Sequence, residues 1–147
     1  MAFTITSSAL TEGGPIPTEY TCDGANKSIP LAWSGVPAGA AELALVMDDP
    51  DARGYVHWVV IGIPPDAAGV GGDAGLPARA REGRRSGGVG YTGPCPPSGT
   101  HHYVFTLYAL SSPLAVAATP TADEVRQAAA NSTLATATLS GTYKRSR

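Results

Sequence analysis

Charged side chains are scarce in this sequence: Lys, Arg, Asp and Glu make up 15% of its 147 residues, and the net charge at pH 7 is −2. Typical domains carry about 25% charged residues. Proteins that bind nucleic acid concentrate Lys and Arg on one surface, so we expect no nucleic-acid partner. Long apolar runs are also missing. None approaches the ~20 residues that cross a bilayer, and we expect no integral membrane segment.

Cysteine is almost absent, with only Cys22 and Cys95. Two cysteines so far apart cannot form the dense framework of a small secreted domain or a zinc knuckle. The N-terminal residues also lack the basic and apolar regions of a secretion signal. We therefore predict a cytoplasmic protein, and because cytosolic thiols are usually reduced, we expect free thiols. A bridge between the two cysteines is the alternative.

Glycine and proline are abundant by contrast, with 18 and 13 residues. They separate short runs of apolar and β-branched residues, a pattern typical of an all-β sandwich or barrel. Residues 66–90 show no period and are expected to form a long excursion over the surface. The chain is predicted to be a single domain, residues 1–147. Strands are predicted at residues 3–7, 31–33, 42–47, 56–63, 102–110 and 134–143.

One helix is predicted near the C-terminal end. Thr121 can cap it, Asp123 and Glu124 suit its first turn, and Val125 to Ala130 are good helix formers. The fold class is therefore mainly β, with one or two peripheral helices.

Polar residues collect at the ends of the predicted strands, first at Asp48-Asp49-Pro50-Asp51. Alternate residues of a strand share a face, so Asp49 continues the row of Leu43, Leu45 and Met47, while Asp48 points the other way. Proline then fixes the chain direction and presents Asp51. An ordinary turn is the alternative, since Asp-Pro-Asp is common turn chemistry.

A histidine leads the next strand. His57 is expected to share a face with Val59, Ile61 and Ile63, at the rim of a buried surface. Because only a short loop separates it from Asp51, a hairpin can bring a carboxylate beside the imidazole, which would favour the charged ring and fix its tautomer. A hydrogen-bonded core histidine is the alternative.

A proline-rich loop leads into the following strand. Pro94, Pro96 and Pro97 stiffen it, and glycines at both ends let it turn sharply. His101 and Tyr103 then share a face with apolar residues and would be neighbouring donors beneath a rigid rim. This arrangement suits a small-ligand pocket, which is apolar with a few placed donors; a rigid turn without a ligand is the alternative.

The collected donors suit a small oxyanion such as phosphate, carboxylate or sulfate. Hydrolysis is less well supported, because the sequence has no Gly-x-Ser-x-Gly elbow. Phosphate-cradling glycine motifs before a helix are missing too. Histidines with an aspartate could hold zinc, but no His-x-x-x-His spacing supports a metal. We predict no cofactor and no metal.

Taken together, these segments resemble the phosphatidylethanolamine-binding protein (PEBP) family, in its short bacterial branch, called Raf kinase inhibitor-like or YbhB/YbcL-like. The motifs that carry the resemblance are Ile16-Pro17, Tyr20-Thr21-Cys22-Asp23-Gly24, Asn26-x-Ser28-x-Pro30-Leu31-x-Trp33, Asp48-Asp49-Pro50-Asp51-Ala52, His57-Trp58-Val59, Gly90-Tyr91-x-Gly93-Pro94-Cys95-Pro96-Pro97, Gly99-x-His101-x-Tyr103-Val104-Phe105 and Leu139-x-Gly141-Thr142-Tyr143.

The resemblance implies a β-sandwich, with a large antiparallel sheet packed on a smaller one, and an anion pocket at the strand ends. It implies ligand-binding roles for six residues and catalytic roles for none. His101 and Tyr103 would donate to the anion, and Asp49 and His57 would shape the donor array. Asp51 would support the loop and Pro97 would form the rim. The ligand-binding residues implied are Asp49, Asp51, His57, Pro97, His101 and Tyr103.

The chain departs from the family pattern at two basic positions. Arg53 stands where the family usually has proline, and is expected to add a cation near the pocket mouth. Arg84-Arg85-Ser86 stands where Asn-Asp or Asn-Ser is common, which would make the approach more basic. Otherwise we expect the arginines of residues 79–85 to belong to a solvated loop, and a dedicated binding surface is the alternative.

The leading hypothesis is a non-enzymatic protein that binds a small anionic ligand, a phosphate, phosphorylated compound or carboxylate. One alternative is an inhibitor or interaction protein that acts on a partner such as a kinase or protease, through the pocket rim and residues 66–90. Another is an enzyme that uses the Asp/His set for acid–base or metal-assisted hydrolysis. Bacterial relatives make a homodimer a reasonable expectation.

Overall fold

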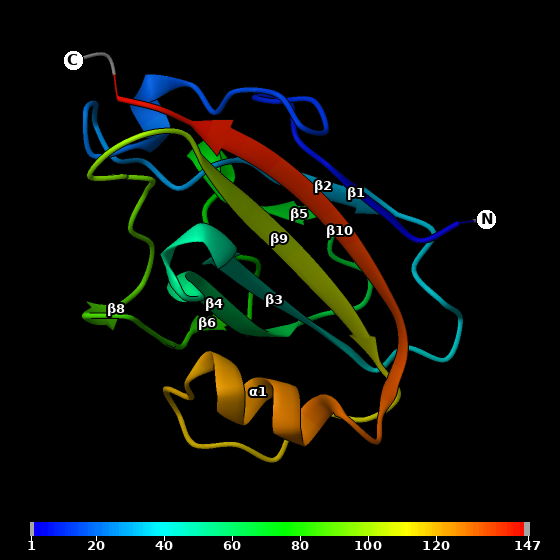
Figure 1. Cartoon of the computed structure of the whole chain (residues 1–147). Helices are drawn as coiled ribbons and strands as arrows, with labels where there is room; N and C mark the ends of the chain where they lie inside the picture. The colour runs from blue at the N-terminus through cyan, green and yellow to red at the C-terminus, as the bar shows by residue number, and fades with distance from the viewer. Residues whose placement is uncertain (1, 146–147) are drawn as a thin grey trace.

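Two antiparallel sheets packed face to face form the body of the molecule (Figure 1). The computed structural model describes residues 2–145. The larger sheet has five strands in the order β10-β9-β3-β4-β6, and the smaller sheet has three in the order β1-β2-β5. The mainly β fold class and the sandwich are confirmed.

The long strands match the sequence patterns closely. The larger sheet contains β3 (Glu42–Asp49), β4 (Tyr55–Ile63), β6 (Arg81–Glu82), β9 (His101–Leu110) and β10 (Thr133–Tyr143), and the smaller contains β1 (Thr4–Thr6), β2 (Leu31–Ser34) and β5 (Gly69–Val70). In the larger sheet, β3 lies between β4 and β9 and is buried along most of its length.

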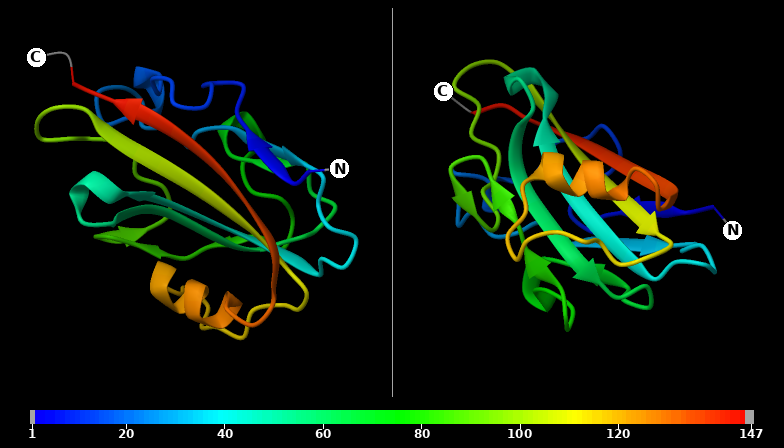
Figure 2. Two further views of the ribbon diagram at one scale, coloured as in Figure 1. Left: turned by 45° about the vertical axis from the view of Figure 1, so that its right-hand side comes forward. Right: turned by 90° about the horizontal axis from the view of Figure 1, so that it is seen from below.

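The larger sheet covers a core on each of its faces. One face packs against the smaller sheet, where Leu45 and Phe105 meet Ile5 and Trp33 in the main core. The other face packs against helix α1 (Ala122–Ala129), which lies across the strands in Figure 2. There Val125 and its neighbours on the helix contact a second apolar cluster of the sheet. Along β3, the odd and even residues therefore contribute to two different cores.

The helix begins as its sequence predicts. The Thr121 hydroxyl accepts a hydrogen bond from the Glu124 backbone N–H at 3.2 Å, and the Glu124 carboxylate accepts one from the Thr121 N–H at 2.9 Å. This reciprocal capping box satisfies two backbone donors that the first turn would otherwise leave without partners. Short 3-10 turns lie elsewhere, as η1 (Thr18–Tyr20), η2 (Pro50–Ala52) and η3 (Gly72–Ala74).

Residues 66–90 are more ordered than the expected surface excursion. Strand β5 completes the smaller sheet, β6 forms the edge of the larger one, and β7 (Arg84–Arg85) pairs with β8 (Gly88–Val89) in a small hairpin. Val70 is buried in the main core. The prediction of irregular chain was wrong, because strands of two residues are too short for a period to be recognised.

Candidate functional site

A cavity of about 260 Å³ opens where β3 ends, β4 begins and β9 begins. Five of the six residues expected at a ligand site line it: Asp49, His57, Pro97, His101 and Tyr103. Asp51 is not among the lining residues. These five come from four segments of the chain, so the fold brings together side chains that the sequence only suggested would meet.

Asp49 and His101 form a hydrogen-bonded pair at the cavity. Asp49 is 2% exposed, and its Oδ2 accepts a hydrogen bond from His101 Nδ1 at 2.7 Å. Its other oxygen, Oδ1, accepts one from the Asp51 backbone N–H at 2.8 Å. The carboxylate is therefore engaged by protein donors on both oxygens, and it orients the imidazole so that Nε2 is the ring nitrogen left for a ligand.

Asp51 fixes the loop rather than facing the cavity. Its Oδ2 accepts hydrogen bonds from the backbone N–H and from Nδ1 of His102, at 2.7 and 2.8 Å. The side-chain hydrogen bond from His102, followed by the backbone one, lowers the pKa of this carboxyl. Asp51 thus ties the turn after β3 to the first residues of β9, which carry His101 and Tyr103.

His57 enters the cavity from a β-bulge. Met47 pairs with Trp58 and Asp48 with Val56, so His57 is an extra residue without a partner on β3. The bulge reverses the alternation: Val59 and Ile61 face the helix, while His57 faces the cavity. The expectation that His57 shares a face with Val59 and Ile61 was wrong for this reason.

Hydrogen bonding sets the tautomer of His57. Its Nδ1 lies 2.7 Å from the Thr92 carbonyl oxygen, which only accepts, so Nδ1 carries the proton. Burial is the main cause that lowers the pKa of His57, and the hydrogen bond to Thr92 opposes it. A neutral His57 consequently presents Nε2 as an acceptor on the other side of the ring.

Tyr103 contributes a buried hydroxyl. The residue is 0% exposed, and its hydroxyl makes no hydrogen bond with any residue from 2 to 145. Burial is the main cause that raises its pKa, with Asp49 next, so the hydroxyl keeps its proton. The ring meets His57 edge-on, with centroids 5.3 Å apart, and Tyr55 flanks His57 at 4.9 Å.

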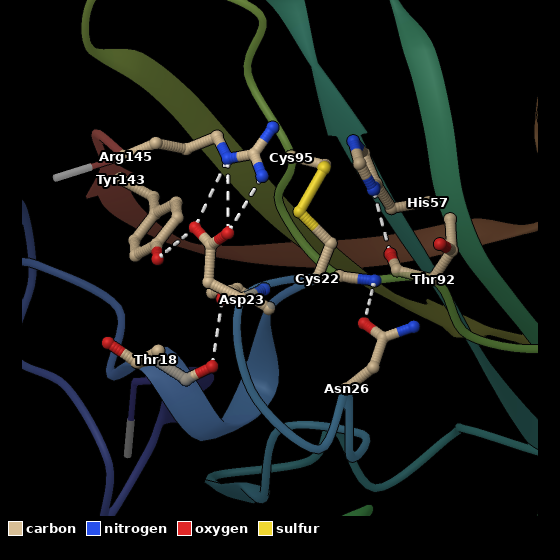
Figure 3. Close-up of a disulfide and its surroundings, with 11 residues drawn as sticks. Thr18, Cys22, Asp23, Asn26, His57, Thr92, Cys95, Tyr143 and Arg145 are labelled. Carbon is tan, nitrogen blue, oxygen red and sulfur yellow. Dashed lines mark hydrogen bonds and ion pairs between the residues drawn. A yellow bond between two sulfur atoms is a disulfide. The ribbon is translucent and has the colours of Figure 1, made fainter. Parts of the chain in front are cut away.

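A disulfide builds part of the cavity wall. Cys22 and Cys95 are bonded to each other across 73 positions of sequence (Figure 3), so the expectation of free thiols was wrong and the alternative holds. The Cys22 backbone N–H also donates to the Pro94 carbonyl at 3.2 Å. Cys95 lines the cavity, and the bond therefore holds the proline-rich loop against the N-terminal segment.

Gly93 lies at the closest approach of those two segments. The Asn26 side chain accepts a hydrogen bond from the Gly93 N–H at 2.8 Å (Figure 3). A Cβ at Gly93 would lie 2.0 Å from the Tyr20 carbonyl oxygen. Only glycine fits this contact.

Several lining residues were not predicted individually. The residues that complete the wall are Ala52, Tyr55, Thr92, Gly93, Cys95 and Pro96. Pro96 and Cys95 belong to the loop that the sequence marks as rigid, so their position could have been inferred. Tyr55 precedes the predicted strand and carries no local signal. Arg53 lies outside this cavity and lines another one, which corrects its expected place at the pocket mouth.

Among residues 2–145, no three His, Cys, Asp or Glu side chains converge in a way that could hold a metal ion. Within the same residues, no helix has the length and apolar character needed to cross a membrane.

Fold and site together define a β-sandwich binding protein with a donor-lined pocket at its strand ends. The sequence profile of the family described as Phosphatidylethanolamine-binding protein matches residues 6–144. The chain belongs to the PEBP family, and is similar to its YbcL-like members. This is a family of binding proteins.

Relatives and solved structures agree with this assignment. LppC of Mycobacterium tuberculosis, which is named as a lipoprotein, is 49% identical over 96% of this chain and 72% of its own length. A UPF0098 protein of Methanothermobacter thermautotrophicus is 46% identical, covering 93% of this chain and 95% of its own.

Two crystal structures superpose closely. A PEBP homologue of Chlamydia trachomatis has a TM-score of 0.92 at 35% identity, with 99% of each chain covered. YbcL of Escherichia coli, described as a member of the mammalian PEBP family, has a TM-score of 0.90 at 32% identity, covering 99% of this chain and 100% of its own.

Proposed function

We propose that this protein binds a small anion, a phosphoryl group or a carboxylate, in the cavity between Asp49, His57, His101 and Tyr103, without catalysing a reaction. The observation that carries the proposal is the Tyr103 hydroxyl, buried at the cavity without a hydrogen-bond partner among the described residues. Buried polar groups are almost always paired, so an unpaired donor at a cavity favours a ligand that accepts.

The other groups of the cavity favour a negatively charged ligand that accepts hydrogen bonds. Asp49 is engaged on both oxygens by His101 and by the Asp51 backbone, so it serves to orient the imidazole. His101 is held by Asp49 through Nδ1, which leaves Nε2 as the ring nitrogen available to the ligand. His57 accepts when neutral, and donates once an anion favours its charged form.

The size of the cavity favours a head group over a large molecule. Its volume of about 260 Å³ lies just below the ~300–1,000 Å³ of drug-sized ligand pockets. A phosphate monoester or a carboxylate fits this space with its substituent directed to the opening, past Pro97 on the rim.

Calorimetric titration with inorganic phosphate and with phosphoethanolamine tests the proposal. We expect binding by the wild type at millimolar concentration or below, and at least tenfold weaker binding by His101→Ala, which removes a charge-assisted donor worth about 1.5–3 kcal/mol. Lys27→Ala is the control, because it removes a cation from an exposed position that does not line the cavity. Absence of binding, or equal losses in both variants, would refute the proposal.

A kinase or protease partner and a homodimer remain predictions from the sequence. Capture from native lysate, compared between wild type and Pro97→Ala, tests the protein partner: retention of the same partner by both would argue against an interaction through the rim. The predicted cytoplasmic location is weakened by the Cys22–Cys95 bond, because disulfides persist in oxidising compartments.

A further inference from the structure

A second cavity lies on the other face of the larger sheet, beside the N-terminal end of α1. Its volume is about 430 Å³. Ala52, Tyr55 and His57 line the anion cavity, whereas the alternating positions Arg53 and Val56 line this one. We call it the arginine groove, defined by the side chains of Arg53, Arg84, Arg85 and Arg126 together with Asp48 and Asp123.

The groove has an excess of positive charge. Arg126 forms ion pairs with both carboxylates: its Nη2 lies 2.8 Å from Asp48 Oδ2, and its Nη1 lies 3.4 Å from Asp123 Oδ1. Among residues 2–145, no carboxylate forms an ion pair with Arg53, Arg84 or Arg85. Four arginines and two aspartates thus line one cavity, on a chain whose net charge is −2.

The arginines stand on backbone that the fold holds in place. The Arg84 backbone N–H donates to the Pro120 carbonyl at 2.7 Å, and Arg84 forms a parallel bridge with Thr121. On the β4 side, the Ser86 hydroxyl accepts from the Val56 N–H at 3.0 Å. These contacts fix the backbone of β7 between α1 and β4, while Arg84 itself is exposed, as expected for a solvated segment.

One local feature, at Arg85, indicates a ligand in the groove. The Nε atom of Arg85 is buried and has no hydrogen-bond partner among the described residues. Arg53 adopts a left-handed backbone with φ of 58°, which disfavours residues other than Gly, Asn and Asp. This left-handed residue ends the η2 turn, and Arg53 lines the same cavity as Arg84 and Arg85.

We propose that the arginine groove is a second anion site, distinct from the Tyr103 cavity, and that it binds a phosphoryl dianion, free or as a monoester. Guanidinium groups match phosphate oxygens through paired N–H donors, which a single lysine ammonium cannot reproduce. A phosphoryl group offers three oxygens and two negative charges, which suit the three arginines that have no carboxylate partner.

The test uses protein labelled with ¹⁵N and carrying His101→Ala, so that the Tyr103 cavity is impaired and the two sites are distinguished. Titration with inorganic phosphate should shift the amide signals of Ser86 and Ala122 in a saturable way, and Thr92 and Gly93 should respond far less. A parallel titration with phosphoserine separates the free anion from the monoester, according to which of them binds more tightly.

Charge variants decide whether the groove itself binds. Arg53→Gln combined with Arg84→Gln should weaken phosphate binding at Ser86 and Ala122 by about tenfold or more. Arg79→Gln is the control, because it removes a positive charge from an exposed position outside the groove. Asp123→Asn should tighten binding, since it removes a negative charge and keeps the capping box of Thr121 and Glu124.

The outcomes are unambiguous. Saturable shifts that the double variant loses, that Arg79→Gln keeps and that Asp123→Asn strengthens support the site. Absence of saturable shifts in the groove, or equal phosphate affinity in the double variant and the control, would overturn it. Because Asp123→Asn acts by gain, a folding defect of the double variant cannot hide the answer.

Discussion

Replacing Tyr103 by phenylalanine should affect folding and binding in opposite ways. In the protein without ligand, the Tyr103 hydroxyl is buried and bonds to none of the described residues, so its removal leaves no other group unsatisfied. A buried unpaired polar group costs free energy. We therefore expect the free energy of unfolding of Tyr103→Phe to be unchanged, or raised by up to about 1 kcal/mol.

Binding should suffer from the same substitution. A hydrogen bond from a neutral donor to a charged acceptor contributes about 1.5–3 kcal/mol. At about 1.4 kcal/mol for each factor of ten, the affinity of Tyr103→Phe for phosphate should fall about ten- to one-hundredfold. Urea denaturation and calorimetric titration on the same preparation measure both quantities.

Tyr91→Phe is the matched control. The Tyr91 hydroxyl donates to the Tyr20 carbonyl at 2.8 Å, so its removal leaves a buried acceptor without its partner and should destabilise the fold by about 1 kcal/mol. The reasoning about Tyr103 fails if Tyr103→Phe destabilises the ligand-free protein by more than Tyr91→Phe does, or if its phosphate affinity equals that of the wild type.

Three further predictions concern the surroundings of the cavity. Cys22→Ser with Cys95→Ser should lower the free energy of unfolding by about 4 kcal/mol in urea, because the bond closes a loop across 73 positions; a loss below about 1 kcal/mol would contradict this chain-entropy estimate. His57→Asn should make the loss of stability at acid pH less steep. Burial holds the pKa of His57 in the folded protein below the reference 6.5, so the unfolded chain binds more protons and the wild type loses stability as the pH falls below 6.5. A variant whose stability falls as steeply as that of the wild type would count against this reasoning. Gly93→Ala should weaken both stability and phosphate binding, since its Cβ would lie 2.0 Å from the Tyr20 carbonyl oxygen. A crystal structure of this variant in which the proline-rich loop keeps its wild-type position would contradict the prediction.

Period-two alternation was sufficient to place residues wherever the strand pairing is regular. Asp49 was predicted on the face of Leu43, Leu45 and Met47, and it is buried on that face at the cavity. On β9, His101 and Tyr103 likewise share the face predicted for them, and both line the cavity. Regular alternation depends only on the chain's own pattern, so a single sequence contains the information.

A β-bulge interrupts the period-two alternation, so the face of each residue beyond it no longer follows from the sequence pattern. The bulge that leaves His57 without a partner depends on the pairing of β4 with β3. A second bulge lies between Leu43 and Leu45 of β3, opposite Gly62, whose φ is 68°. Each adds one residue to β4, which moves the following residues to the other face. His57 was therefore correctly predicted to lie near Asp49, but Val59 and Ile61 were wrongly predicted to share its face.

Contacts between distant segments were the other limit. Nothing near Cys22 in the sequence shows that it meets Cys95, and the Asn26–Gly93 hydrogen bond spans 67 positions. The resemblance to the family indicated which residues would gather at the site, whereas the disulfide that supports their loop depends on tertiary approach alone.

The start of β4 lines both cavities, so a ligand in one cavity can affect the residues of the other. Along the start of β4, Tyr55 and His57 face the Tyr103 cavity, while Val56 faces the arginine groove. The Ser86 carbonyl accepts from the Tyr55 hydroxyl at 3.2 Å and from Arg85 Nη1 at 2.9 Å, so one acceptor joins residues of both sites. Burial chiefly lowers the pKa of His57, and the positive charge of Arg85 adds to the effect. An anion held by Arg85 would offset that charge and make protonation of His57 easier, so filling the groove would add a donor to the neighbouring cavity.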